Sequence, residues 1–307
     1  MSERLVLVTG ANGRIGLALC RRLAEEGPPR RALALVRSER AAAAVRALPA
    51  RERPEVAIAD YRDADSIAEY TARCEAAVHL VGLLKETRAN RYVDAHERAC
   101  TALSAAADRT GLRRIVSLSI LGADPDSPNA CLASRARADA ILLRAKTSAV
   151  VIRLPMVLGA GDPASAALAR QARGPRARLV RGGASLDQPI AARDVVSALA
   201  AALDRPGLDD AVLELAGPES LPHRDLVLRA ASVLGTQVSI STVPAPLACA
   251  AAWLAERLST DPPITRAMLG VLEHDDAIDP EPARAKLGLA LTPLDTALRE
   301  ALASGAR

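Results

Sequence analysis

The sequence predicts an α/β protein with a doubly wound parallel sheet and a smaller C-terminal α/β lobe. Two observations carry this prediction. Short apolar runs alternate with helical patterns through the first half of the chain, as a parallel sheet with crossover helices requires. The apolar run 5–8 leads directly into a glycine-rich turn and then into the helix-like stretch 17–26. With 307 residues, half of them apolar, the chain can also form a substantial core and a second lobe.

The alternation sets the expected elements in order. Strands are expected at 4–9, 32–36, 55–59, 76–81, 113–119 and 149–153. Helices are expected at 14–26, 39–48, 63–73, 90–111 and 132–146. After residue 155 the pattern breaks into pieces separated by Gly and Pro. We therefore expect a dinucleotide-binding Rossmann domain at 1–155 and a smaller lobe formed mainly by 156–307, with 189–204 returning to the first domain.

The glycine turn has the pattern G-x-x-G-x-x-G between strand and helix. Its first glycine permits a tight turn, the second lets backbone N–H groups approach a pyrophosphate, and the third lets the helix pack closely. The alternative is a tight strand-to-helix turn without a ligand. The pattern favours a bound dinucleotide, with cofactor contacts expected from Gly10, Asn12, Gly13, Arg14, Ile15 and Gly16.

The end of the second expected strand bears on the choice of cofactor. An acidic residue there would hydrogen-bond the ribose of NAD, whereas Arg37, Ser38 and Arg40 suit a 2′-phosphate. The sequence therefore favours NADP(H) over NAD(H), against the alternative of a solvated helix start. Asp60 follows the third strand, where it could meet the adenine amino group or cap a helix.

Composition excludes several classes of function. Aromatic residues are only three Tyr and one Trp, and no basic run is interleaved with them, so nucleic-acid binding is not expected. The five Cys and four His form no metal-ligand spacing, which predicts reduced thiols and no metal site. No apolar run reaches the about 18 residues of a membrane span, and the run 5–8 is too short for a signal peptide. We expect a cytoplasmic protein, with a peripheral position at the inner membrane left open.

Seven further motifs follow the glycine turn: ADYRD at 59–63, VHLVG at 78–82, IVSLSILGAD at 115–124, VIRLPMVLG at 151–159, QPI at 188–190, RDV at 193–195 and LAGPE at 215–219. With these motifs the chain resembles the extended or atypical short-chain dehydrogenase/reductase superfamily, which includes NAD(P)-dependent epimerases and dehydratases. It is most similar to bacterial relatives of the nucleotide-binding accessory subunit of respiratory complex I. The resemblance implies further cofactor contacts at Val81, Gly82, Ser119 and Arg135.

Active members of that superfamily use a Tyr-x-x-x-Lys pair, in which tyrosine transfers the proton and lysine holds the nicotinamide ribose. The matching positions here hold Cys131 and Arg135, and no displaced copy of the pair exists. Ser119 matches the catalytic serine. Cys131 could act as a proton donor, with Arg135 favouring its thiolate form, or it could be a small buried residue that fills the space of the missing phenol.

Two classes of function follow. One is a catalytically degraded protein that holds nicotinamide dinucleotide as a structural, assembly or redox-sensing ligand and presents its C-terminal lobe to a protein partner or a membrane-associated complex. The other is an NADPH-dependent oxidoreductase or an epimerase/dehydratase-like enzyme with a non-standard proton donor. The missing pair favours the first.

The segment 244–258 has apolar residues at 247, 251, 254 and 258, which is a helical stripe. We expect it to pack in the core of the small lobe. The alternatives are a cover over a substrate cleft and a docking surface for a partner.

Overall fold

The computed structural model describes residues 4–26 and 30–303. The chain forms two compact units. Unit 1 contains the residues up to Leu83, Asn90–Arg153 and Val195–Leu213, and unit 2 contains Leu84–Ala89, Leu154–Asp194 and the residues from Glu214 onward. In the described ranges, none of the helices is long and apolar enough to cross a membrane.

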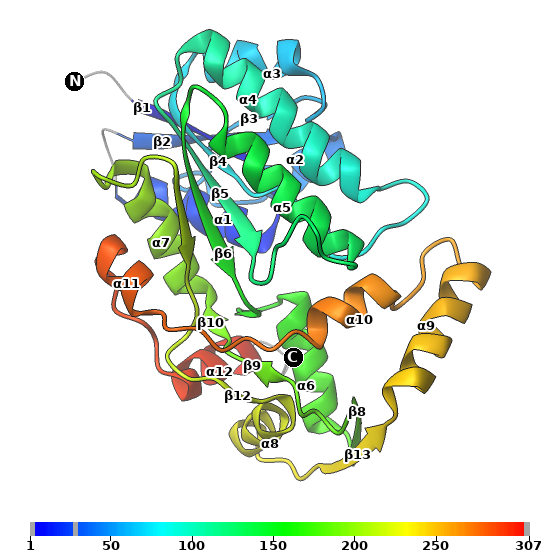
Figure 1. The fold of residues 1–307 in the computed structure, drawn as a ribbon. Coiled ribbons are helices and arrows are strands. Elements are labelled where there is room, and N and C mark those ends of the chain that lie inside the picture. Colours follow the sequence, from blue (N-terminus) through cyan, green and yellow to red (C-terminus); the bar gives the residue numbers. More distant parts are fainter. Residues whose placement is uncertain (1–3, 27–29, 304–307) are drawn as a thin grey trace. The chain divides into compact units, whose positions relative to one another are not determined.

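Unit 1 is built on a seven-stranded sheet with the order β3-β2-β1-β4-β5-β6-β11 (Figure 1). The register of β1 with β2 and β4, of β2 with β3, and of β4 with β5 is parallel throughout. The fold class is confirmed, with the order of a Rossmann sheet and its switch point between β1 and β4. The strands are β1 (Arg4–Thr9), β2 (Arg30–Val36), β3 (Glu55–Ile58), β4 (Cys74–His79), β5 (Arg114–Ile120), β6 (Ser148–Leu154) and β11 (Ala211–Glu214).

Helices connect these strands. They are α1 (Arg14–Glu25), α2 (Glu39–Arg46), α3 (Ala64–Thr71), α4 (Ala99–Thr110), α5 (Ala130–Leu143) and α7 (Ala192–Asp204). The helix predicted at 90–111 is not uniform, because it begins with the π-helical turn η1 (Val93–Arg98) before α4. Such turns insert an extra residue into the helix and often occur at functional sites.

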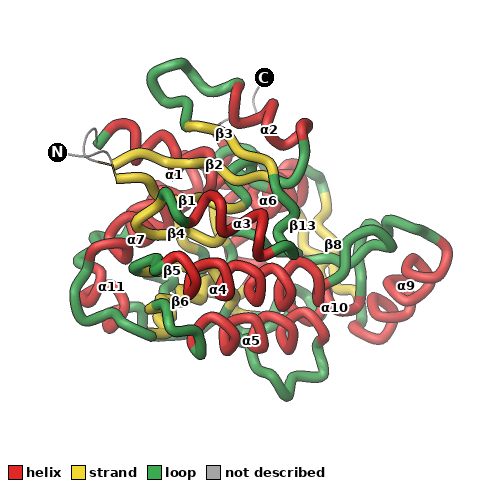
Figure 2. Tube along the Cα trace, turned by 90° about the horizontal axis from the view of Figure 1, so that it is seen from above, coloured by secondary structure: helices red, strands yellow, loops and turns green. Residues whose placement is uncertain are grey.

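One face of the sheet in unit 1 is covered by α3, α4 and α5, which lie side by side in Figure 2. Leu7, Leu33 and Leu35 of the strands pack there against Leu103 and Leu142 of the helices. Both faces of the central strands are buried, which explains why β1 and β2 appear in the sequence as continuous apolar runs. The carboxyl ends of these strands carry the glycine turn.

The described part of unit 2 contains three two-stranded sheets and six further helices. Its core lies between α6, α8 and α12, with Leu168, Leu226 and Leu298 fully enclosed. The strands are β7 (Val157–Leu158), β8 (Arg176–Val180), β9 (Leu186–Asp187), β10 (Ile190–Ala191), β12 (Leu221–Pro222) and β13 (Ser239–Val243). The helices are α6 (Pro163–Arg173), α8 (His223–Leu234), α9 (Ala245–Leu258), α10 (Arg266–Leu272), α11 (Glu281–Leu287) and α12 (Leu294–Ala303).

Two motifs of the resemblance hold unit 2 together. The Gln188 amide donates to the carbonyls of Gly217 and Ile278 at 2.9 and 3.0 Å, and its oxygen accepts the N–H of Ile278. A Cβ at Gly217 would lie 2.0 Å from the Pro189 carbonyl oxygen, so this position requires glycine. The segments around 188 and 217 are therefore joined through close backbone packing.

The prediction for the helical stripe at 244–258 was wrong. In α9 only Ala252 is buried, while Leu247, Leu254 and Leu258 are 63%, 50% and 78% exposed. An apolar period of 3.6 residues shows that a helix has an apolar stripe, but it does not show what covers that stripe.

Candidate dinucleotide site

The glycine turn has the geometry that a pyrophosphate requires. Gly10 has a φ of +68°, a left-handed backbone conformation that glycine adopts without steric cost, so the turn favours glycine at this position. Gly13 is the N-cap residue of α1, its N–H donates to the Gly10 carbonyl at 3.0 Å, and no side chain caps the helix. A Cβ at Gly16 would lie 2.7 Å from the Ala11 Cα. The first-turn N–H groups of α1 thus face outward without a side-chain cap, where the helix dipole favours an anion.

Tyr61 stabilises this turn, a role that the sequence did not indicate. Its hydroxyl accepts the N–H of Gly10 at 3.0 Å and donates to the Leu35 carbonyl at 2.9 Å. Burial raises the pKa of Tyr61 to about 12, so the phenol stays protonated. The turn after β1 is therefore tied to the end of β2.

The side chains expected to contact the adenosine end of the cofactor form hydrogen bonds with other residues of the chain. The Arg37 guanidinium donates to the Asn90 side-chain oxygen at 2.8 Å, and Ser38 is the N-cap of α2. Asp60 forms a bidentate ion pair with Arg62, and this hydrogen bonding lowers the pKa of Asp60. The cap of α3 is Asp63, so the capping alternative for Asp60 was wrong. Arg37 and Ser38 are exposed beyond the end of β2, as a 2′-phosphate site would need.

Arg135 lies against the loop that follows β4. Its Nη1 is 3.4 Å from the carbonyl oxygens of both Val81 and Leu118. A Cβ at Gly82 would lie 1.6 Å from Nη2, which means that the guanidinium occupies the space directly over the Gly82 backbone. Three of the predicted site residues, Val81, Gly82 and Arg135, are therefore brought together.

Cys131 also faces this loop. The residue is 1% exposed, and its Sγ is 3.6 Å from the Leu83 carbonyl oxygen. His96 Nε2 lies 3.1 Å from both the nitrogen and the oxygen of Leu83, and Tyr92 stacks on the His96 ring at 5.4 Å. Cys131 and His96 thus approach the same peptide group, one from the first turn of α5 and the other from η1.

His79, the last residue of β4, completes the buried polar cluster under the loop. Its Nδ1 lies 2.9 Å from the Thr9 hydroxyl. Burial, with a smaller effect of Arg135, lowers the pKa of His79 and that of His96 to about 3. In the described part of the chain, His79 Nε2 and His96 Nδ1 have no hydrogen-bond partner. Both imidazoles are therefore neutral at physiological pH.

Ser119 is held by a buried carboxylate. Its hydroxyl donates to Asp139 Oδ2 at 3.0 Å, and Arg153 Nε donates to the same oxygen at 3.1 Å. Asp139 is 4% exposed, and burial raises its pKa despite both hydrogen bonds. Asp139 lies eight positions after Cys131, two helical turns along the same face of α5. The sequence reasoning missed this residue, although the spacing 131, 135, 139 was a signal.

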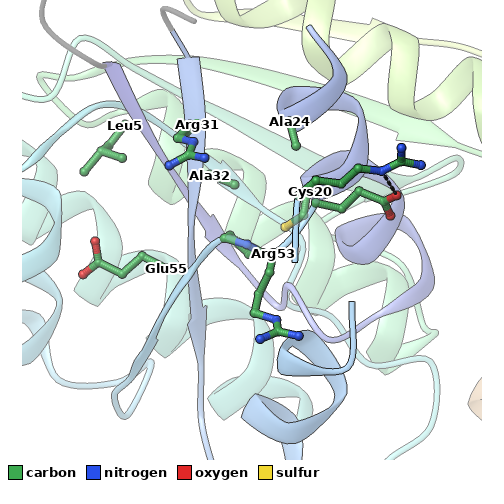
Figure 3. Close-up of a pocket in the computed structure, with 10 residues that line it drawn as sticks. Leu5, Cys20, Ala24, Arg31, Ala32, Arg53 and Glu55 are labelled. Carbon is green, nitrogen blue, oxygen red and sulfur yellow. Dashed lines mark hydrogen bonds and ion pairs between the residues drawn. The ribbon is translucent and has the colours of Figure 1, made fainter. Parts of the chain in front are cut away.

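A small cavity of about 80 Å³ lies at the opposite end of the sheet. Leu5, Arg31 and Glu55 from the amino-terminal parts of β1, β2 and β3 line it, and Figure 3 shows that the side chains of Arg31, Arg53 and Glu55 do not converge. Burial raises the pKa of the lining thiol, Cys20, to about 12, so the thiol is unreactive. The described residues contain no cluster of three or more potential metal ligands, here or elsewhere.

Comparison with known proteins defines the family. A family model described as NAD(P)H-binding matches residues 10–206, which run from the glycine turn through α7. The chain belongs to this NAD(P)H-binding family. The residues of the glycine turn, the loop 80–83 and the α5 positions all lie inside the matched stretch.

Two curated relatives of this NAD(P)H-binding protein differ in what their names state. The mitochondrial NADH dehydrogenase [ubiquinone] 1 alpha subcomplex subunit 9 of Arabidopsis thaliana is 31% identical over 173 residues, covering 54% of this chain and 42% of the plant protein. The chain thus matches less than half of that subunit's length. A ceramide reductase of Caulobacter vibrioides is 26% identical over 243 residues, covering 79% of this chain and 74% of the reductase.

Solved structures agree on the fold of the family. The UDP-glucose 4-epimerase of Thermus thermophilus in complex with NAD superposes with a TM-score of 0.74 at 18% identity, covering 99% of this chain and all of the epimerase. The UDP-N-acetylglucosamine 4-epimerase of Bacillus cereus gives 0.72 at 15% identity, covering 98% of this chain and 99% of the other. At these identities the likeness shows that the fold is shared.

Proposed function

We propose that this protein binds NADP(H) in preference to NAD(H) and keeps it as a structural, assembly or redox-sensing ligand. The proposal rests on the contacts of Cys131 and Arg135, which stand at the two positions that hold Tyr and Lys in active relatives. Cys131 is buried against the Leu83 carbonyl, and the Arg135 guanidinium lies between the carbonyls of Val81 and Leu118. These side chains stabilise the loop after β4, and a guanidinium cannot replace the tyrosine as general acid because it stays protonated at physiological pH.

The residues present fit a dinucleotide. The uncapped N-terminus of α1 and the glycines at 10 and 13 would hold the pyrophosphate, and Arg37 with Ser38 would hold a 2′-phosphate. The loop 81–82 would border the nicotinamide end. A bound nicotinamide dinucleotide supplies hydride chemistry, while the chain's own residues bind and orient it.

We further propose a location and a partner for the protein. It would lie in the cytoplasm, at the periphery of the inner membrane, with unit 2 facing a protein partner or a membrane-associated complex. The name of the plant relative, a subunit of NADH dehydrogenase, supports an assembly role of this kind.

A second candidate is an NADPH-dependent oxidoreductase that uses Ser119 and Asp139. The observation that favours it is the hydrogen bond from Ser119 to a buried carboxyl group whose pKa is raised. In such an enzyme Asp139 would exchange a proton with the Ser119 hydroxyl, and Ser119 would donate to a carbonyl oxygen. The name of the Caulobacter relative, a reductase, is consistent with this candidate.

Turnover of NADPH against a panel of carbonyl compounds separates the two candidates. We expect the parent to oxidise NADPH barely above background, and Cys131→Ala to change that little. Restoring the pair with Cys131→Tyr and Arg135→Lys should raise the rate, since proton transfer typically contributes about 100- to 10,000-fold. Robust turnover by the parent that Asp139→Asn abolishes, with NADPH still bound, would favour the second candidate and reject the first.

A further inference from the structure

Helix α9 exposes an apolar surface that nothing in the described part of unit 2 covers. Its residues 245–255 carry no charged side chain, and their only polar groups are the Cys249 thiol and the Trp253 indole N–H. Only Ala252 is buried, and the neighbouring helix is α10 (Figure 1). Along α9, Leu247, Trp253, Leu254 and Leu258 are between 41% and 78% exposed. Monomeric soluble proteins rarely leave such a surface in water.

The exposed residues of α9 cover one broad side of the helix. At about 100° per residue, Leu247, Leu254 and Leu258 share one part of that side, and Trp253 lies about 120° from them. The opposite side, around Ala252, is buried or half-buried against the rest of the chain. The exposed side is wider than the seam that a single docked helix would cover, so an apolar phase in which this side can lie fits it better.

The length of α9 limits what can cover its apolar side. Its 14 residues span about 21 Å, less than the about 30 Å hydrocarbon core of a bilayer, so it cannot cross a membrane. Two copies paired along a helix of this length would bury much less than the about 800 Å² per partner of a stable interface. An apolar stretch of 10 to 14 residues belongs to a buried core helix, to a signal peptide or to a re-entrant or interfacial segment, and α9 is exposed rather than buried in the core.

The polar end of α9 suits a membrane surface. The Arg257 guanidinium lies 4.3 Å from the centre of the Trp253 ring, and Glu256 pairs with Arg266. Tryptophan with a nearby cation is favoured where hydrocarbon meets lipid headgroups. We propose that α9 inserts into the interfacial region of a lipid bilayer, with its last turn at the headgroups and its first three turns in the acyl boundary. The inference does not depend on dinucleotide binding, because all its residues belong to unit 2.

The inserted helix has no excess of basic residues, since Glu256 and Arg257 balance one another. Binding should therefore be driven by apolar burial and should require neither anionic lipid nor low salt. Phosphatidylcholine vesicles are the appropriate probe, because the chain's net charge of +4 would attract it to anionic vesicles regardless of α9.

Trp253 is the only tryptophan of the chain and reports directly on α9. We expect its emission to shift to the blue when the full-length protein is titrated with phosphatidylcholine vesicles, and brominated acyl chains to quench it. The shift should persist at high salt. Leu247→Gln and Leu254→Gln should each weaken partitioning by about tenfold, since a buried leucine contributes more than the 1.4 kcal/mol that corresponds to tenfold.

Leu228→Gln is the matched control. Leu228 is 44% exposed on α8 of the same unit, and its substitution should leave partitioning unchanged. The α9 leucines are half or more exposed, so circular dichroism should show both variants folded. Unchanged Trp253 emission and no co-sedimentation with vesicles would overturn the proposal. A blue shift of Trp253 emission that appears without lipid as the protein dimerises would assign α9 to an interface with a second copy. A shift that needs anionic lipid and disappears at high salt would show that charge drives the binding. Either result would overturn the proposal.

Discussion

Acidification should destabilise unit 1 through its two buried histidines. His79 and His96 are 1% and 0% exposed, and the pKa of each is lowered from 6.5 to about 3 by burial and by Arg135. In the unfolded chain both imidazoles would titrate near 6.5. The unfolded state therefore binds more protons between these values, so the stabilisation is present above pH 6.5 and is lost as the pH falls toward 3.

The magnitude follows from linkage. Each histidine costs about 1.4 kcal/mol of stability per pH unit once the pH is well below 6.5. Between pH 7 and pH 5 this amounts to about 2 kcal/mol per histidine and about 4 kcal/mol for the pair. That is a large part of the 5–15 kcal/mol by which domains are typically stable.

Urea denaturation followed by circular dichroism from pH 5 to pH 8 measures the effect. His96→Asn should lower stability at pH 8, because it removes a packed ring, but it should also flatten the dependence on pH by about half. The difference in slope between parent and variant isolates the histidine from other titrating groups. If the parent and the variant lose stability in parallel as the pH falls, the neutral buried state of His96 is wrong.

Three further predictions concern the dinucleotide site. Tyr61→Phe should cost about 1–3 kcal/mol of unfolding free energy, because the N–H of Gly10 and the carbonyl of Leu35 lose their partner, and it should weaken NADPH binding in calorimetry; an unchanged stability would argue against the Tyr61 link. Gly13→Val should abolish NADPH binding in a fluorescence titration, since the side chain would occupy the space of the pyrophosphate, while its circular dichroism stays that of the parent. Normal NADPH binding by the variant would show that the phosphate site is assigned wrongly. Arg37→Ala should weaken NADPH about tenfold and leave NADH nearly unchanged, and equal affinities of the parent for both cofactors would remove the basis for this preference.

The central strands of the sheet could be predicted because they are buried on both faces and therefore form continuous apolar runs. The six strands expected in the first 153 residues all occur, each within two residues at either end. The strand β11 was missed because its four residues include only one buried side chain, Leu213, and therefore carry little pattern. The π-helical turn before α4 was missed because no periodicity in the sequence records it; Tyr92 stacks on the His96 ring at this turn.

The geometry of the glycine turn was predictable because its backbone conformation requires a residue type. Gly10, with its positive φ, and Gly16, packed on Ala11, left such a signal. Hydrogen bonds that join distant segments left none: Tyr61 reaches Gly10 across 51 positions, and Ser119 reaches Asp139 across 20. Such partners become visible only when the sheet places their strands side by side.

A crystal structure of the full chain with NADPH tests the central claim most directly. We predict the pyrophosphate at the N-terminus of α1, the 2′-phosphate beside Arg37, and Arg135 still bound to the carbonyls of Val81 and Leu118, with no acid within hydrogen-bond distance of the reacting face of the nicotinamide. A cofactor bound elsewhere would contradict the assigned site. A nicotinamide in contact with Ser119, with Asp139 behind it and space for a carbonyl substrate, would contradict the view that the ligand is held without being consumed.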